Sequence, residues 1–417
     1  MVFKVIIVGG GIAGLAAAIV LRQNEREITV LEQSPISQEI GATISLQPNA
    51  SKIVEGQWGL AAKLKERGSM DDEAFEIYNL DGELQLHIPL QTKGKYGAER
   101  VLYHRADLHE VLRERATSHA FPGRAATVRT SSKVVNCNCE EGTVALASGE
   151  VISADLIVGA DGIKSVVRES VLGQKVTARP TGLSAYRMMI SAEDLQREAD
   201  VAKVIDPRRG CTTMVIGRDR RLIMGPARGG TIYSIVALVP DENMNEDPTR
   251  TSWTTKGDHD KMMQSFADFP DWAQKPLLLA KSSSLGLWQL RDLDPLQTWY
   301  RGRAILIGDA AHAMLPTQGQ GASQAIEDAE ALGAFFDEFE KSASANTMDA
   351  VARVNETIFR CRYDRATTIQ LYSRHAAEPA TEPGSRRVHM NPAEFTDYNC
   401  SYNGALDWQR RQEVVLH

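Results

Sequence analysis

The chain has 417 residues, of which 43% are hydrophobic and 24% are charged. This length and composition indicate a folded globular protein of roughly two or three domains. The net charge of −7 argues against nucleic acid as a partner, because binding to phosphates needs a basic face, but it leaves room for an anionic small substrate held by local arginines.

Cysteines and apolar runs bear on where the protein works. The five cysteines are scattered without metal-ligand spacing, so we expect reduced, intracellular thiols and no metal site. No apolar run reaches the roughly 18 residues that a membrane-spanning helix needs. These features predict a cytoplasmic protein without a membrane span, acting as a monomer or a homodimer.

The N-terminus carries a glycine-rich nucleotide-binding pattern. Residues 3–8 form an apolar run typical of a strand, and Gly9, Gly11 and Gly14 follow in G-x-G-x-x-G spacing before a predicted helix at 15–22. Glycines at these positions permit a tight turn, close approach of the backbone to a pyrophosphate and close packing of the helix on the strand. The start of the helix offers free N–H groups to the phosphates.

A second predicted strand, at 28–31, ends at Glu32. We expect this carboxylate to accept hydrogen bonds from the ribose hydroxyls of an adenosine. A carboxylate there disfavours a 2′-phosphate, so NADP is not the expected tightly held nucleotide.

Strand patterns dominate two later segments. Residues 73–90 alternate like paired strands joined by a turn at Asp81-Gly82, and residues 179–240 contain several further strands. We expect these segments to form a sheet domain inserted between nucleotide-binding parts. The polar residues 241–260 predict an exposed loop.

Two more strand ends carry an acid beside a glycine. A buried strand at 156–158 leads into Asp161-Gly162, and another at 304–307 leads into Gly308-Asp309. If these strands share a parallel sheet, both turns meet at its carboxyl edge, where ligands bind.

Helices are predicted at about 322–340 and 348–375, and the tail after Pro379 is expected to be irregular. The predicted domains are a discontinuous nucleotide-binding domain over 1–72, 100–178 and 286–345, a sheet domain over 73–99 and 179–285, and a C-terminal helix and tail over 346–417.

Three motifs, GGGIAGLAAA, ADGIKSVVR and GDAAHAMLPTQGQGASQAIEDAEAL, make the chain resemble the class A FAD-dependent aromatic hydroxylases, in their salicylate-hydroxylase-like branch. The resemblance covers about residues 3–375. It implies an α/β fold like that of para-hydroxybenzoate hydroxylase: a Rossmann-like FAD-binding domain, an inserted, mostly antiparallel substrate sheet and a C-terminal helix.

The resemblance also implies the chemistry. FAD would be bound tightly, while NADH or NADPH would bind transiently, because the chain has only one nucleotide fingerprint. O2 would be the co-substrate, and an aromatic small molecule would be hydroxylated through a flavin C4a-hydroperoxide. The family branch is frequent in fungi, which favours a role in secondary metabolism.

Individual roles follow from the same resemblance. The glycines of the first motif would hold the pyrophosphate, Asp309 a ribityl hydroxyl, and the backbone of 319–321 the pyrimidine edge of the flavin. Arg105 would reach the pyrophosphate or the ribityl chain, with an ordinary surface arginine as the alternative. The implied cofactor-binding set is Gly9, Gly11, Gly14, Glu32, Gly41, Ala42, Arg105, Asp161, Asp309, Pro316, Gly319, Gln320, Gly321 and Ala322.

His312 is a candidate catalytic base, but one helical turn after Asp309 a packing role is favoured. Glu327 and Asp328 are interpreted as a solvated or structural pair.

Substrate residues are sought on the inserted sheet. Arg187 would anchor a carboxylate or phenolate, or else lie on the sheet surface, and Tyr233 would position substrate or else pack in the sheet. The branch often has Tyr-Pro where this chain has Gly225-Pro226, so we expect a substrate bulkier than salicylate, such as a polyketide-derived phenol or an indole. Further candidates are Tyr186, Met214 and Arg228.

Three other functions remain open. A flavin-dependent halogenase shares the fold, but its Trp-x-Trp-x-Ile-Pro segment and channel lysine are missing from the sequence. A flavin-dependent oxidase or epoxidase is a second alternative. A non-enzymatic binding protein like the prenyl-GTPase chaperones is the third, although it would have no use for Asp309 and the 319–321 loop.

Overall fold

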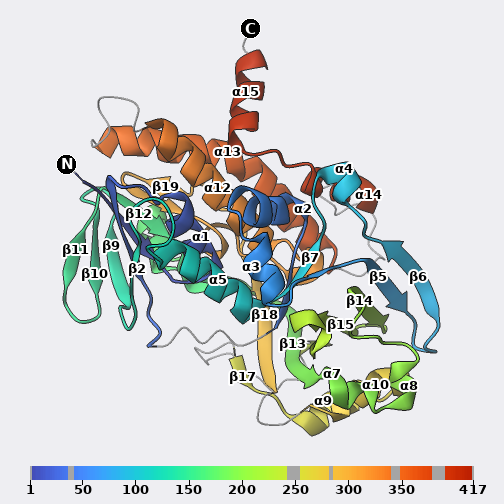
Figure 1. Cartoon of the computed structure of the whole chain (residues 1–417). Coiled ribbons are helices and arrows are strands. Elements are labelled where there is room, and N and C mark those ends of the chain that lie inside the picture. Colours follow the sequence, from blue (N-terminus) through green and yellow to red (C-terminus); the bar gives the residue numbers. More distant parts are fainter. Residues whose placement is uncertain are drawn as a thin grey trace. The chain divides into compact units, whose positions relative to one another are not determined.

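The computed structural model describes residues 2–35, 42–241, 254–280, 285–339, 348–377 and 390–415 (Figure 1). The chain divides into two compact units. Unit 1 comprises residues 1–38, 109–179 and 292–417, and unit 2 comprises residues 39–108 and 180–291. The fold is α/β, as predicted, with helices and sheets in both units.

A six-stranded sheet lies in unit 1, in the order β19-β20-β12-β1-β2-β8. Its strands are β1 (Phe3–Val8), β2 (Arg26–Leu31), β8 (Thr127–Arg129), β12 (Leu156–Gly159), β19 (Tyr300–Arg301) and β20 (Ala304–Leu306). All neighbours are parallel except β19, which runs antiparallel to β20. The strands β1 and β12 are apolar along almost their whole length, because central parallel strands are buried on both faces.

The helices of unit 1 are α1 (Ile12–Val20), α5 (Arg105–Thr117, which begins in unit 2), α6 (Val166–Leu172), α11 (Asp309–His312), α12 (Gly321–Phe339), α13 (Met348–His375), α14 (Pro392–Cys400) and α15 (Ala405–Val415). Short 3-10 turns lie at Gly162–Lys164 and Pro316–Gln318. A separate three-stranded antiparallel sheet contains β9 (Val134–Asn138), β10 (Thr143–Leu146) and β11 (Val151–Ser153). The predicted helices at 322–340 and 348–375 are confirmed as α12 and α13.

The prediction of an irregular tail was wrong for residues 392–400 and 405–415, which form α14 and α15. Asn391 caps α14 in a capping box with Glu394, and Pro392 occupies the first turn. In α15, Trp408 packs edge-on against Phe335 of α12, with ring centroids 6.4 Å apart. The local capping signal was therefore present in the sequence, but the packing of α15 depends on a distant helix.

Unit 2 contains an eight-stranded sheet in the order β17-β18-β13-β16-β15-β14-β5-β6. Its strands are β5 (Ala74–Tyr78), β6 (Leu84–Pro89), β13 (Arg179–Ser191, whose first residue belongs to unit 1), β14 (Cys211–Ile216), β15 (Arg221–Ala227), β16 (Ile232–Pro240), β17 (Thr254–Lys256) and β18 (Gly286–Asp292, whose last residue belongs to unit 1). The pair β5–β14 is parallel, whereas β13–β16, β15–β16, β14–β15, β5–β6 and β17–β18 are antiparallel. The strand β17 lies where a loop was predicted; residues 242–253 of that loop lie outside the described residues.

One face of this sheet carries the core of unit 2. The cluster joins side chains of the sheet, such as Met188 and Ile235, to Leu195 and Met262 on flanking helices. Those helices are α7 (Ala192–Gln196), α8 (Ala199–Ala202), α9 (His259–Ser265) and α10 (Asp271–Leu278). The remaining helical segments of unit 2 are α2 (Pro48–Ser51), a π-helical turn (Lys52–Gln57), α3 (Ala61–Glu66), α4 (Lys93–Tyr96) and a 3-10 turn (Arg228–Gly230).

A smaller sheet in unit 2 differs from the predicted domain boundaries. It contains β3 (Thr43–Leu46), β4 (Met70–Asp71) and β7 (Val101–His104), in segments that the sequence assigned to the nucleotide-binding domain. Hydrogen bonds tie this sheet to the larger one: Thr43 N donates to Ser234 Oγ at 3.2 Å, and Thr212 Oγ1 donates to Asp72 Oδ2 at 2.9 Å. These long-range contacts group residues 39–72 with the eight-stranded sheet.

Candidate functional site

The glycine turn after β1 has two tightly packed positions and one open position. A Cβ on Gly9 would lie 2.3 Å from the Ala160 carbonyl oxygen, and a Cβ on Gly14 would lie 1.9 Å from the Gly9 carbonyl oxygen. A Cβ on Gly11 would meet nothing within 4 Å. Gly11 also begins α1 without a side-chain cap, so the N–H groups of the first turn face an open space suited to an anion.

Glu32 holds this turn in place from the end of β2. Its carboxylate accepts hydrogen bonds from the backbone N–H groups of Gly10 and Ser34, both at 2.8 Å. Burial alone would raise the pKa of Glu32, but these backbone hydrogen bonds and the neighbouring His109 hold it below its usual value. The carboxylate is therefore ionised and fixed, and its contact with a ribose stays a prediction.

Asp161 follows β12 and caps the next helix. Its carboxylate accepts hydrogen bonds from the backbone N–H groups of Val166 at 2.7 Å and Val167 at 3.2 Å, and from the Ser165 hydroxyl at 2.5 Å. Loss of hydration raises the pKa of Asp161 in spite of these bonds. The carboxylate thus shapes the turn, while a Cβ on Gly162 would meet nothing within 4 Å.

The loop between β20 and α12, residues 308–321, is here called the β20–α12 loop. It begins at Gly308, whose φ of +58° favours glycine and whose added Cβ would lie 3.0 Å from the Ala13 Cβ. Asp309 is exposed; its carboxylate makes no hydrogen bond among the described residues, although its charge acts on the nearby Arg168. The loop passes through Pro316 and through Gly319, which is left-handed with φ +62°, and ends where Gly321 begins α12.

These turns lie together at one edge of the parallel sheet of unit 1, since β20, β12, β1 and β2 are neighbours in that order. Their open glycines, the start of α1 and the exposed Asp309 form a cradle of backbone N–H groups with one carboxylate. Such a cradle fits the pyrophosphate and a polyhydroxyl chain of a dinucleotide cofactor such as FAD. A side chain at Gly11 or Gly321 would project into that open space.

A buried polar cluster lies behind the β20–α12 loop. His312 Nε2 lies 2.6 Å from Asp328 Oδ2, and both side chains are 1% exposed. Arg362 of α13 bonds Asp328 Oδ1 at 2.9 Å and Glu327 Oε2 at 2.5 Å. The packing role predicted for His312 and the structural role of Glu327 and Asp328 are thereby confirmed, whereas the alternative that Glu327 and Asp328 are solvated was wrong. Arg362 follows Asp328 by 34 residues, so no local sequence pattern indicated that it would join this cluster.

The Asp328 carboxylate is ionised within this cluster. Burial opposes its charge, but His312, Arg362 and the hydrogen bond from the Gly308 N–H outweigh burial and lower the pKa of Asp328 to about 2. The nearby buried carboxyl group of Glu330 differs: burial raises its pKa, although it accepts hydrogen bonds from Tyr402 Oη at 2.7 Å and Ala405 N at 3.0 Å.

In unit 2, Arg187 lies on the face of the large sheet opposite the core. The half-buried guanidinium lies 5.1 Å from the centre of the Trp288 ring, and its Nε is buried with no hydrogen-bond partner among the described residues. Burial, followed by the charge of Arg105, lowers the pKa of Arg187 to about 10. An arginine in this state can hold an anion.

The register places Arg187 at one end of a half-buried row that crosses the sheet strand by strand: Arg187, Val236, Ile223, Met214 and Ile77. Gly225 is on the same face, opposite Ser234 in β16. A Cβ on Gly225 would make only ordinary contacts, the nearest being 3.8 Å to Thr212 Oγ1. This face therefore offers a mainly apolar surface with a cation at one end.

Other predicted residues of unit 2 are placed differently. Tyr233 and Tyr186, 1% and 2% exposed, belong to the core on the opposite face, which favours packing; substrate positioning by Tyr233 stays a prediction. Arg228 forms an ion pair with Asp107 at 2.7 Å. The backbone N–H of Arg105, at the start of α5, donates to the Ala42 carbonyl at 2.9 Å, while Gly41 lies outside the described residues.

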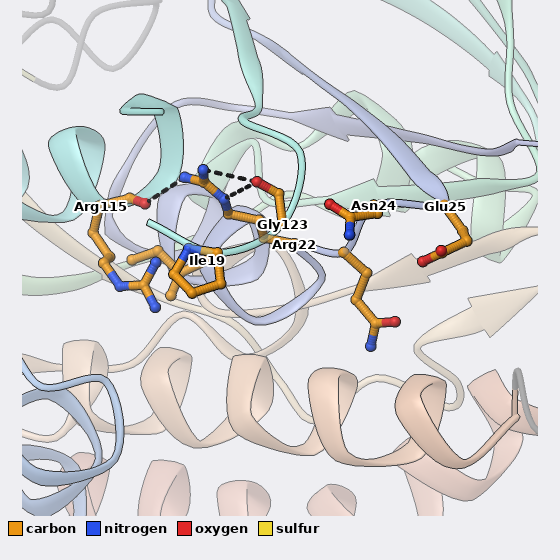
Figure 2. A pocket seen from close by; sticks show the side chains of 8 residues that line it. Ile19, Arg22, Asn24, Glu25, Arg115 and Gly123 are labelled. Carbon is orange, nitrogen blue, oxygen red and sulfur yellow. Dashed lines mark hydrogen bonds between the residues drawn. The ribbon is translucent and has the colours of Figure 1, made fainter. Parts of the chain in front are cut away.

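A cavity of about 340 Å³ lies at the C-terminal end of α1, where Ile19 and Arg22 line it (Figure 2). None of Gly9, Gly11 and Gly14 lines it. Arg22 lines it and donates hydrogen bonds to the carbonyl groups of Arg115, Phe121 and Gly123 at 2.8–3.1 Å. Because these carbonyls satisfy the guanidinium, Arg22 joins the ends of α1 and α5. Among the described residues, no helix could cross a membrane and no cluster of ligating side chains could hold a metal ion.

Comparison with known sequences identifies the family. A family model described as FAD binding domain matches residues 2–356. The chain is 30% identical to hispidin-3-hydroxylase of Neonothopanus nambi, covering 99% of this chain and 97% of that protein. It is 32% identical to salicylate hydroxylase of Pseudomonas putida, covering 89% of this chain and 85% of that protein.

Comparison with solved structures supports the same family. A salicylate hydroxylase substrate complex has a TM-score of 0.73 at 29% identity, covering 92% of this chain and 91% of that one. The complex of CtdE with FAD and substrate 4 has a TM-score of 0.80 at 23% identity and covers 100% of both chains, which shows the shared fold. The chain therefore belongs to the class A FAD-dependent monooxygenases, the family of aromatic hydroxylases that the three motifs predict.

Proposed function

We propose that this enzyme uses FAD and NAD(P)H to hydroxylate a phenol or indole larger than salicylate. The observation that carries the substrate proposal is the face of the unit 2 sheet on which Arg187 ends a half-buried apolar row. Unit 1 is the proposed FAD-binding domain, and the eight-stranded sheet of unit 2 is the proposed substrate domain.

The glycine cradle of unit 1 supports the proposed hold on FAD. The N–H groups at the start of α1 bind the pyrophosphate, Glu32 the adenosine ribose and Asp309 a ribityl hydroxyl. The backbone of residues 319–321 and the start of α12 lie at the pyrimidine edge, where the helix dipole favours negative charge. Asp161 keeps its turn in shape, and Pro316 and Ala322 complete the proposed set in unit 1. Contacts of Ala42 and Arg105, which belong to unit 2, with FAD stay predictions from the resemblance.

The bound flavin supplies hydride acceptance from NAD(P)H and activation of O2 for transfer of one oxygen atom to an aromatic carbon. The protein supplies a positive charge for the substrate and apolar side chains that exclude water. A pKa of about 10 keeps Arg187 ionised at neutral pH, so its guanidinium can hold a phenolate or carboxylate. Val236, which is paired with Arg187, and Ile223, one strand further across the sheet, keep water from the ring that reacts.

Gly225 supports a substrate with more than one ring. The related branch often has tyrosine at this position; glycine removes that ring from the Arg187 face, where an added Cβ would make only ordinary contacts. Two of the relatives are named hispidin-3-hydroxylase and 3-hydroxybenzoate 6-hydroxylase 1, so relatives of this chain are named for different substrates. The five free cysteines support a reducing, cytoplasmic setting.

The test is a substrate panel with the FAD-loaded enzyme. Salicylate, fused-ring phenols and indoles are compared by NADH and NADPH consumption, O2 uptake, peroxide release and mass of the product. We expect hydroxylated product, in step with NAD(P)H consumption, from a multi-ring phenol or indole. Coupled turnover of salicylate alone would contradict the size argument, and a protein that takes up no flavin would contradict the whole proposal.

A further inference from the structure

Helix α13 runs beside α12 in unit 1 (Figure 1). One face of α13 is buried against α12 and the β20–α12 loop that precedes it. The residues of this face are spaced three and four apart, as neighbours on one side of a helix are. They are Arg362, Ala366, Gln370 and Ser373, which are 0–1% exposed.

Arg362 reaches both ends of the β20–α12 loop. At the start of the loop, the Gly308 N–H donates a hydrogen bond to Asp328 Oδ2 at 2.9 Å, and Arg362 Nε donates one to Asp328 Oδ1, also at 2.9 Å. At the end of the loop, an Arg362 terminal nitrogen donates to Gln324 Oε1 at 2.7 Å, and Gln324 N donates to the Gln320 carbonyl at 2.8 Å. A single guanidinium therefore connects the two turns that bracket the loop.

The same helix face also contacts the middle of the loop. Gln370 Nε2 donates to the Ala313 carbonyl at 3.0 Å, and Thr317 Oγ1 donates to the Ser373 carbonyl at 2.5 Å. The loop is thus held at its start, middle and end by one rigid element.

A buried ion pair contributes little net stability, because desolvation of the two charges offsets their attraction, whereas it restricts geometry strongly. The planar guanidinium fixes the directions of its N–H groups, and a lysine ammonium could satisfy only part of this set. We propose that Arg362 is a positioning residue for the flavin: through Asp328 and Gln324 it sets the β20–α12 loop in the conformation that binds FAD. This inference rests on the proposed contacts of Asp309 and residues 319–321 with FAD.

Arg365 provides a matched control on the same helix. It bonds Glu327 at 2.7 Å and 2.8 Å, as part of the same buried cluster, and also the carbonyl groups of Tyr398 and Asn399. Among the described residues it makes no hydrogen bond to Asp328 or Gln324. Arg365 is 13% exposed, and its loss removes a partner of Glu327 while the bonds of Arg362 to Asp328 and Gln324 stay in place.

The experiment compares Arg362→Lys, Arg362→Met and Arg365→Met. The melting temperature of the FAD-free protein reports folding, and titration of that protein with FAD gives the dissociation constant. We expect both methionine variants to melt earlier and Arg362→Lys to recover most of that loss. FAD should bind at least about tenfold more weakly to both Arg362 variants, but within about twofold of the original affinity to Arg365→Met.

Equal FAD affinity in all variants, with only the melting temperature changed, would overturn the inference and leave Arg362 a structural residue. If the Arg362 variants do not fold, Gln324→Met removes the acceptor of the Arg362 hydrogen bond at the end of the loop and leaves the bond to Asp328 in place; unchanged FAD affinity there would likewise count against the inference. An unmodified protein that binds no FAD would instead contradict the proposed function, so the two failures are distinguishable.

Discussion

Two glycines of the same turn should respond in opposite ways to the addition of one methyl group. Gly14→Ala would place a Cβ 1.9 Å from the Gly9 carbonyl oxygen, which is 1.5 Å short of the 3.4 Å at which ordinary contact begins. The obstacle is backbone, so the glycine turn or α1 must move. Gly11→Ala would place its Cβ where nothing lies within 4 Å, and Gly11 has a φ of −74°, which alanine adopts without strain.

The magnitudes follow from these contacts. Overpacking against backbone costs about 3 kcal/mol, so Gly14→Ala should lower the free energy of unfolding of the FAD-free protein by about that amount. Gly11→Ala should change it by less than about 0.5 kcal/mol. If the pyrophosphate approaches the backbone at Gly11, the new methyl group should weaken FAD binding by at least about 1.4 kcal/mol, which is tenfold.

The assay is denaturant unfolding of the FAD-free variants, followed by FAD titration of those that fold. Gly11→Ala should unfold at the same denaturant concentration as the original protein and bind FAD poorly, whereas Gly14→Ala should unfold at a clearly lower denaturant concentration. Undiminished FAD affinity in Gly11→Ala would refute the placement of the pyrophosphate at this turn. Normal stability of Gly14→Ala would refute the packing argument.

Four further outcomes are expected. Asp309→Ala should lose most bound FAD and still fold, because its exposed carboxylate makes no side-chain hydrogen bond within the described residues; full flavin retention would count against its contact with the ribityl chain. Arg187→Ala should raise the KM for an anionic substrate about tenfold or more with little change in flavin content, and an unchanged KM would place this arginine outside the site. Gly225→Tyr should lower kcat/KM for multi-ring phenols more than for salicylate, and equal losses would contradict the proposed role of Gly225 in admitting a larger substrate. The fold lowers the pKa of Asp328 to about 2, so the ionised carboxylate stabilises the folded state at any pH above its usual pKa of about 4. This contribution is lost as the pH falls from about 4 toward 2. The free energy of unfolding of Asp328→Asn should therefore depend less steeply on pH in that window than that of the original protein.

Much of the nucleotide-binding part could be predicted from the sequence, because local spacing determines it. A strand followed by Gly9, Gly11 and Gly14 fixes a turn whose geometry needs small residues, and the structure places their Cβ positions against backbone or open space. The strand ends at Asp161 and Asp309 were predictable for the same reason. An apolar run that ends in an acid and a glycine leaves few other local structures possible.

Other features were decided by tertiary structure, because they depend on partners far away in the chain. From the sequence, Glu327 and Asp328 could equally be solvent-facing residues. In the structure they are buried and paired with Arg362, which follows them by 35 and 34 residues. The sheet registers alone separate Arg187, on the open face, from Tyr233, in the core. The sequence by itself thus determined the cofactor family through its local turns, while long-range packing decided which side chains stay open to a ligand, since burial is a property of neighbours that local spacing does not specify.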